Sequence, residues 1–238
     1  MGELYAKLYW QFGRGCFSFS EASRVSGLEE AKLHVAFSKL HKEGALIIFG
    51  RGRPRAYRLL DPRNHILRIG GLRGEEFEQE EYVQLIHDMF RILRERVGLV
   101  SFCVYGSVAR GEAKPSSDLD ILLISEEFTG SLASRIDRLS FVEAEAAGEL
   151  DFLKSRGYGT SLSFMPLRKQ EAETEPALFL DLTVNSKVFY DEGGFLKGVL
   201  SRLRARLELA GAMRVKTDEG WYWDLKPDYR FGEKVLVP

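Results

Sequence analysis

Two short groups of residues near the middle of the 238-residue chain have types and spacings that suit phosphate and metal chemistry. Gly106-Ser107 follows an apolar run; a glycine there lets the backbone approach a ligand, and the serine offers a hydroxyl and an amide at the start of a short helix. Eleven residues after Ser107 comes Asp118, and Asp120 follows it at a spacing of two. In a strand this spacing places both carboxylates on one face, with Cα atoms about 6–7 Å apart. Such a pair suits Mg²⁺ or Mn²⁺, so the two groups together predict metal-assisted phosphoryl transfer.

Each group alone has a simpler interpretation, since a Gly-Ser pair is usually only a turn and Asp-x-Asp is commonly a solvated strand end. Their combination is much more specific. The ordered set is Gly106-Ser107, Ala109-Arg110-Gly111, Ser117-Asp118 and Asp120. This order, followed by an apolar run, resembles the polymerase-beta-type nucleotidyltransferase superfamily, particularly its small "minimal" members. The resemblance covers residues 75–190.

The resemblance implies a role for each matching residue. Gly106 and Ser107 would hold the β- and γ-phosphates of a nucleoside triphosphate, and Asp118 and Asp120 would coordinate catalytic Mg²⁺. Arg110 would either contact a phosphate or brace its loop by pairing with nearby acids, and both remain open. The implied reaction transfers a nucleoside monophosphate, AMP in the first instance, to a hydroxyl of a protein or small molecule.

One element of the family pattern is missing. Active members of the superfamily carry a third carboxylate on the following strand, which helps to bind metal and can act as a general base. Here the strand expected at 159–167 offers only Ser161 and Ser163 at the alternating positions. Four acids could substitute from elsewhere, or could simply be solvated: Glu149, Asp151, Glu171 and Asp181. The gap leaves two alternatives to an enzyme: a weakly active or inactive nucleotide-sensing, DNA-binding regulator, and, by family analogy, an antitoxin-like partner of a helical toxin.

The elements around these residues predict an α+β domain with a mixed sheet and flanking helices. Nearly continuous apolar runs at 99–105 and 119–125 are typical of strands buried on both faces. Helical periodicity and further apolar runs predict the remaining elements. These are helices at 75–97, 131–155, 176–184 and 194–211, and strand-like pieces at 187–190 and 213–223. The aromatic segment 221–229 is either a partner site or a tail held against the domain by Trp221 and Trp223.

Residues 1–60 have a different pattern, in which short helices precede a hairpin with strands at 45–49 and 56–60. Ser20 is expected to cap the second helix, and the third is expected over 29–42. The pattern resembles the winged helix-turn-helix family. Residues 61–74, which are rich in glycine, are expected to be a linker. The nucleotidyltransferase-like domain, with C-terminal helices and a tail, then spans 75–238.

Charge distribution points to DNA as a partner of the first part. Residues 1–74 hold 13 Lys and Arg against 6 Asp and Glu, whereas the remainder holds 21 against 29. Basic residues that could contact DNA lie on the hairpin and on the helix before it. They are Arg51, Arg53, Arg55 and Arg58 on the hairpin, and Lys32 and Lys39 on the helix. The alternative is a solvated basic loop, or one that contacts the acidic second domain.

Composition excludes some classes of protein. Hydrophobic residues make up 45% of the chain and charged residues 29%, which is typical of globular proteins and not of disordered ones. No apolar run is long enough for a membrane span and the start does not resemble a signal peptide, so we expect a cytoplasmic protein with no membrane partner. Cys16 and Cys103 are too few for a disulfide framework and are expected to be ordinary thiols.

Overall fold

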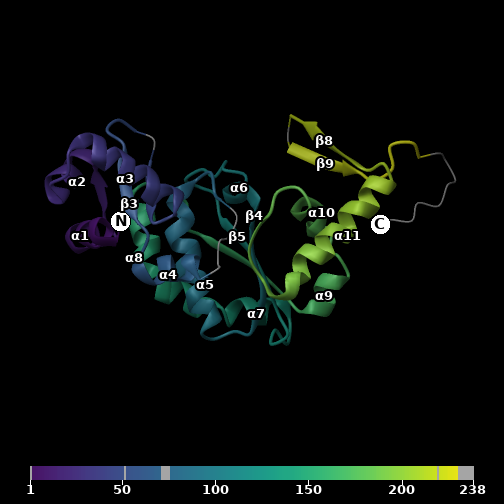
Figure 1. Cartoon of the computed structure of the whole chain (residues 1–238). Helices are drawn as coiled ribbons and strands as arrows, with labels where there is room; N and C mark the ends of the chain where they lie inside the picture. The colour runs from purple at the N-terminus through teal and green to yellow at the C-terminus, as the bar shows by residue number, and fades with distance from the viewer. Residues whose placement is uncertain (1, 51, 71–75, 219, 230–238) are drawn as a thin grey trace.

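The structure is a computed structural model that describes residues 2–50, 52–70, 76–218 and 220–229. Figure 1 shows a helical N-terminal part beside a central sheet, with further helices and a small hairpin at the opposite end of the molecule. None of the helices in the described part of the chain combines the length and the apolar composition that a membrane span requires.

The N-terminal part combines helices with a three-stranded antiparallel sheet in the order β1-β3-β2. Its elements are α1 (Gly2–Phe12), β1 (Cys16–Ser18), α2 (Phe19–Ser26), α3 (Glu30–Lys42), β2 (Leu46–Ile48) and β3 (Ala56–Leu59). Helix α2 is capped by Ser18 and not by Ser20, because Ser18 and Glu21 form a reciprocal capping box. Assignment of this part to the winged helix-turn-helix family stays a prediction.

The segment expected to be a linker contains a helix, α4 (Pro62–Ile69). Asp61 caps it by accepting a hydrogen bond from the amide of Arg63, and Pro62 occupies its first turn, where no amide donor is needed. Its Asn64 side chain is fully buried and donates to Asp88 at 2.9 Å. A linker was therefore the wrong expectation for residues 62–69, which pack against the second part of the chain.

The second part is built on a four-stranded mixed sheet in the order β6-β5-β4-β7. Strand β4 pairs antiparallel with β5 and β7, whereas β5 pairs parallel with β6. The strands are β4 (Leu99–Tyr105), β5 (Leu119–Ser125), β6 (Leu162–Leu167) and β7 (Lys187–Asp191). The helices are η1 (Glu80–Tyr82), α5 (Val83–Arg94), α6 (Gly106–Ala109), α7 (Leu132–Asp137), α8 (Ser140–Ser155), α9 (Lys169–Glu173), α10 (Leu178–Leu182), η2 (Glu192–Gly194) and α11 (Phe195–Leu209).

Alternation along the strands divides the core of this part in two. Leu119, Ile121 and Leu123 of β5 pack with α5 and α8 on one face of the sheet. Leu122 and Ile124 pack with α9, α10 and α11 on the other. A two-stranded hairpin, β8 (Met213–Thr217) and β9 (Gly220–Asp224), follows α11 and lies on this second side (Figure 1).

The N-terminal part is joined to the second part by a shared core and a buried ion pair. Ile47, Phe49 and Leu60 belong to the same hydrophobic cluster as α5 and α8. Beside them the guanidinium of Arg58 donates to both carboxylate oxygens of Glu149, at 2.5 and 2.6 Å, and both side chains are almost fully buried. The expectation that Arg58 contacts DNA is therefore wrong, because its guanidinium is buried and paired with Glu149.

Candidate functional site

The predicted site lies at one end of the central sheet, where β4 ends and β5 begins. Tyr105 is paired directly with Asp120 on one side, and Ser163 of β6 is paired with Asp120 on the other. These three side chains are half-buried and lie on the sheet face that α10 and α11 cover. The structure therefore places a single carboxylate between a phenol and a hydroxyl, with Asp118 exposed just before the strand.

Gly106 is required where the chain leaves β4 and enters α6. It has φ +70°, and a Cβ at this position would lie 3.0 Å from Cγ of Asp120. Any side chain here would thus be strained in the backbone and would collide with the carboxylate. The turn that carries Ser107 consequently packs directly on Asp120, so the structure brings together Gly106, Ser107 and the two aspartates as the sequence predicts.

Hydrogen bonds with Gln79 fix the loop that joins α6 to β5. The side-chain amide of Gln79 donates to the carbonyl of Ala113 at 3.0 Å and accepts from the Ala113 amide at 2.9 Å. Further along, Gly159 passes so close to the backbone carbonyls of residues 114–117 that a Cβ would collide with them. These contacts position Asp118 from outside β5, and sequence reasoning missed them because a bidentate amide has no local signature.

Burial dominates the electrostatics of Asp120. Removal from water raises its pKa, the charge of Asp118 acts in the same direction, and hydrogen bonding from Ser163 and the charge of Arg110 oppose it. The pKa of Tyr105 is raised to about 12, first by burial and then by Asp120. Half-buried Asp120, with the carboxylate of exposed Asp118 beside it, provides a place for a cation.

The donors present fit a hard divalent ion. Mg²⁺ is commonly bound through one or two carboxylates, with substrate phosphates and water completing its shell. Asp118 and Asp120 meet this minimum, and the Ser163 hydroxyl adds another oxygen beside Asp120. Among the described residues no group of three or more His, Cys, Asp or Glu side chains is placed to hold a metal.

None of the four proposed substitutes supplies a third carboxylate. Glu149 is bound by Arg58, Glu171 accepts from Arg135 at 2.6 and 2.8 Å, and Asp181 accepts from Trp223 at 3.1 Å. Asp151 is exposed on α8, which covers the opposite face of the sheet. The position across from Asp120 belongs to Ser163, in agreement with the strand's sequence.

Comparisons with known proteins identify the family of this chain. A family model described as a nucleotidyltransferase domain matches residues 86–179. Protein adenylyltransferase MntA of Thermococcus cleftensis is 33% identical over 90 residues, which are 38% of this chain and 90% of that relative. The chain belongs to the nucleotidyltransferase family. Residues 86–179, which the family model matches, contain both motifs and the strands β4 and β5 that carry them.

Two further matches to this chain have lower sequence identity. The putative protein adenylyltransferase MJ1305 of Methanocaldococcus jannaschii is 25% identical over 123 residues, which are 52% of this chain and 80% of that protein. A crystal structure of a toxin–antitoxin with AMP-PNP overlays with a TM-score of 0.35 and 16% identity, covering 53% of this chain and 92% of that one. A TM-score of this size supports no conclusion.

Arg110 lies where α6 ends, and its side chain contacts two other residues of this chain. Its Nε donates to Glu112 at 2.8 Å, and its guanidinium carbon lies 5.7 Å from the ring centroid of Trp221. The pairing with Glu112 matches the bracing alternative, while the charge of Arg110 still reaches Asp120. Trp223 packs against the core of the second part and donates to Asp181, as expected for a tail held against the domain, whereas Trp221 is 41% exposed.

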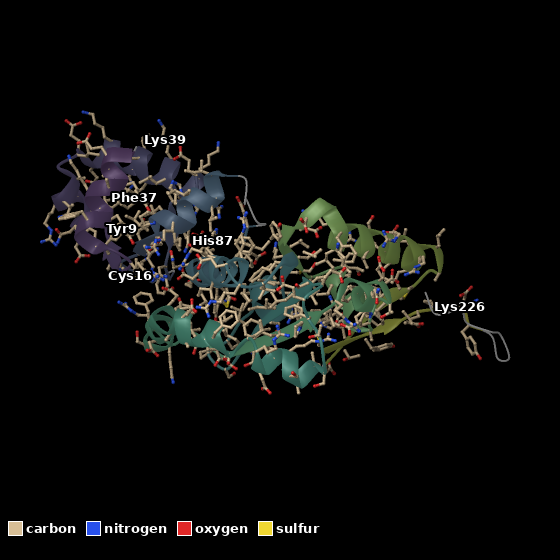
Figure 2. The ribbon with its side chains drawn as sticks, turned by 90° about the horizontal axis from the view of Figure 1, so that it is seen from below. Tyr9, Cys16, Phe37, Lys39, His87 and Lys226 are labelled. Carbon is tan, nitrogen blue, oxygen red and sulfur yellow. The ribbon has the colours of Figure 1, made fainter. Side chains whose placement is uncertain are left out.

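The residues predicted to bind DNA lie on the N-terminal part, away from the aspartates. Arg53 and Arg55 are exposed in the loop between β2 and β3, and Lys32 and Lys39 are exposed on α3. Figure 2 shows Lys39 at the outer surface of this part. Arg51 lies outside the described residues. Nothing in this arrangement tests DNA binding, which stays a prediction.

Proposed function

We propose that this chain transfers a nucleoside monophosphate, AMP in the first instance, from a nucleoside triphosphate to a hydroxyl group of a protein. The observation that supports the reaction type is the packing of the Gly106-Ser107 turn on Asp120, with Asp118 beside it, in a family of nucleotidyltransferases. The activity for which the Thermococcus cleftensis relative is named supports AMP and a protein acceptor.

Each residue of the site has a distinct task in this proposal. The amides and hydroxyl at Gly106-Ser107 hold the phosphate tail in line, so that the acceptor oxygen attacks the α-phosphorus as the bond to the β-phosphate breaks. Asp118 and Asp120 would hold Mg²⁺, which neutralises phosphate charge when bound. Because Ser163 is no base, the acceptor proton passes to water, and the expected turnover is slow.

The test uses full-length protein, Mg²⁺ and ATP labelled at the α-phosphate, with the product of a neighbouring reading frame as the first acceptor. Pyrophosphate release and label transfer to protein are measured for the wild type and for Asp118→Asn and Asp120→Asn. Asp137→Asn, on the exposed side of α7, is the matched control. We expect activity in the wild type and the control and at least a hundredfold loss in the site variants. Equal activity in all four proteins would refute the assignment.

A second candidate function is favoured by Ser163 at the position of the third carboxylate and by the basic N-terminal part. In this case the nucleotide is bound without turnover and alters binding to DNA. DNA affinity would be measured against salt concentration with and without ATP. Arg53→Ala and Arg55→Ala should each make the salt slope shallower, by about 0.9 for each DNA phosphate that the arginine neutralises. Salt-independent or absent DNA binding would eliminate this candidate.

A further inference from the structure

The C-terminal hairpin presents one face with an unusual composition. Arg214 is paired with Trp223 across β8 and β9, and Lys216 is paired with Trp221. Because residues two apart in a strand share a face, these four side chains lie together on one side of the hairpin. The hairpin begins at Met213, C-terminal to residues 86–179, which match the nucleotidyltransferase family model.

This face is turned towards the nucleotide site. Trp223 packs on the same sheet face that carries Tyr105, and its indole nitrogen donates to Asp181 of α10. Trp221 lies 5.7 Å from the guanidinium of Arg110, which ends the helix begun by Gly106. In Figure 1 the end of the hairpin at which β8 finishes and β9 starts lies on the side of α6. The hairpin is thus anchored at its base and meets the phosphate-binding loop near its turn.

Positive charge is concentrated where the hairpin β8–β9 meets the end of α6. The guanidinium of Arg214 lies 3.9 Å from the centroid of the Trp221 ring, so the ring contacts two arginines at once. Glu112, two residues after Arg110, has a lowered pKa, first through its hydrogen bond from Arg110 and further through the charges of Arg110, Lys216 and Arg214. One exposed carboxylate therefore lies within the field of three cations.

The partners of these cations leave capacity for a further anion. Arg214 has an ion pair with Asp181 at 3.5 Å, but its buried Nε has no hydrogen-bond partner among the described residues. Lys216 is exposed, and within the described part of the chain no carboxylate lies within ion-pair distance of it. The three cations outnumber the two carboxylates beside them, Glu112 and Asp181, and an anion bound among them would offset the remaining repulsion.

We propose that Arg214 and Lys216, set by Trp221 beside Arg110, form a wall of the nucleotide site that binds the β- and γ-phosphates of the triphosphate and the departing pyrophosphate. This inference rests on the proposed function, because it assumes that a nucleoside triphosphate occupies the Gly106-Ser107 turn. It assigns the hairpin a role in recognising the polyphosphate tail. The proposal assigns the hairpin no contact with the nucleoside or the α-phosphate.

The experiment measures binding of ATP, AMP and pyrophosphate by calorimetry, each with Mg²⁺ and the full chain. The proteins are the wild type, Arg214→Gln, Lys216→Gln and the double variant. Arg202→Gln, which removes an exposed arginine of α11, is the matched control. Each site substitution should weaken ATP and pyrophosphate binding by about tenfold and leave AMP binding unchanged. The salt dependence of ATP binding should be shallower in the double variant.

The outcomes distinguish an error in the role of the hairpin from an error in the proposed function. If wild-type protein binds ATP and the double variant binds ATP and pyrophosphate equally well, the hairpin role is wrong while the proposed function stands. Equal weakening of AMP and ATP would also overturn it, since the hairpin would then act on the nucleoside or on folding. Unchanged nucleotide binding with impaired labelling of an acceptor protein would reassign the wall to the acceptor. If the wild type binds no nucleotide, both proposals fail. Lys216→Gln removes an exposed side chain and keeps the test valid should Arg214→Gln loosen the hairpin.

Discussion

Restoring a carboxylate at the position across from Asp120 is the sharpest test of the site's geometry. Ser163 is paired with Asp120 in parallel register, and neighbouring strands lie about 4.8 Å apart. Two unit charges about 5 Å apart repel by about 1 kcal/mol in water and about 3 kcal/mol at an effective dielectric constant of 20. Because both positions are half-buried, we expect Ser163→Asp to destabilise the metal-free protein by about 1–2 kcal/mol at neutral pH. This corresponds to a fall in Tm of about 2–8 °C for a chain of this length.

Adding Mg²⁺ should reverse that loss, because the variant would offer three carboxylates to one cation. Thermal unfolding in EDTA measures the loss of stability, and thermal unfolding with Mg²⁺ measures its recovery. Pyrophosphate release reports any gain in turnover. Ser201→Asp, which adds the same charge on the exposed side of α11, is the control and should respond little to Mg²⁺. A Ser163→Asp protein with wild-type stability in EDTA and no added response to Mg²⁺ would show that Ser163 does not face Asp120.

Two further predictions concern buried or partly buried carboxylates that arginines hold. Glu149→Gln should destabilise the protein by about 3 kcal/mol, since it leaves the buried charge of Arg58 without its partner; urea unfolding measures the loss, and a change below about 1 kcal/mol would contradict it. Hydrogen bonding from Arg135 lowers the pKa of Glu171 from 4.5 to about 2 in the folded protein. The stability that this pair contributes should therefore be complete above about pH 4.5 and lost as the pH falls towards 2. Glu171→Gln should flatten the pH dependence of Tm in that window, and an unaltered profile would count against the pair.

Strands whose side chains are apolar on both faces could be predicted with accurate bounds. β4 and β5 occupy the predicted ranges 99–105 and 119–125, because continuous apolar runs bounded by glycine and polar residues leave little choice of register. The helix expected over 131–155 is instead α7 and α8, which break near Leu139. Leu139 is fully buried there, and the core contact outweighs the periodicity that runs through both helices.

Long-range pairing was what the sequence could not reveal. Arg58 has the same local surroundings as the exposed arginines of its hairpin, and its partner Glu149 lies 91 residues away. The same limit applies to the contact of Gln79 with Ala113 and to that of Trp221, in the C-terminal hairpin, with Arg110. Both join residues that are distant in the sequence and adjacent only in the folded chain. The motif residues themselves were predictable, because the chemistry restricts their types and the strand period restricts their spacing.

The absence of a third carboxylate and the cations of the C-terminal hairpin β8–β9 both affect how the charge of a bound triphosphate is balanced. A site with two carboxylates holds less metal charge than a site with three, so more of the charge on a bound triphosphate must be balanced by side chains of the protein. Arg214 and Lys216 are placed to do this. The two features should then be coupled: in a Ser163→Asp background, where metal binds more readily, removing the hairpin cations should weaken ATP binding less than it does in the wild type. A double-mutant cycle on ATP affinity measures that coupling, and strictly additive effects would mean that the hairpin and the metal site act on the nucleotide independently.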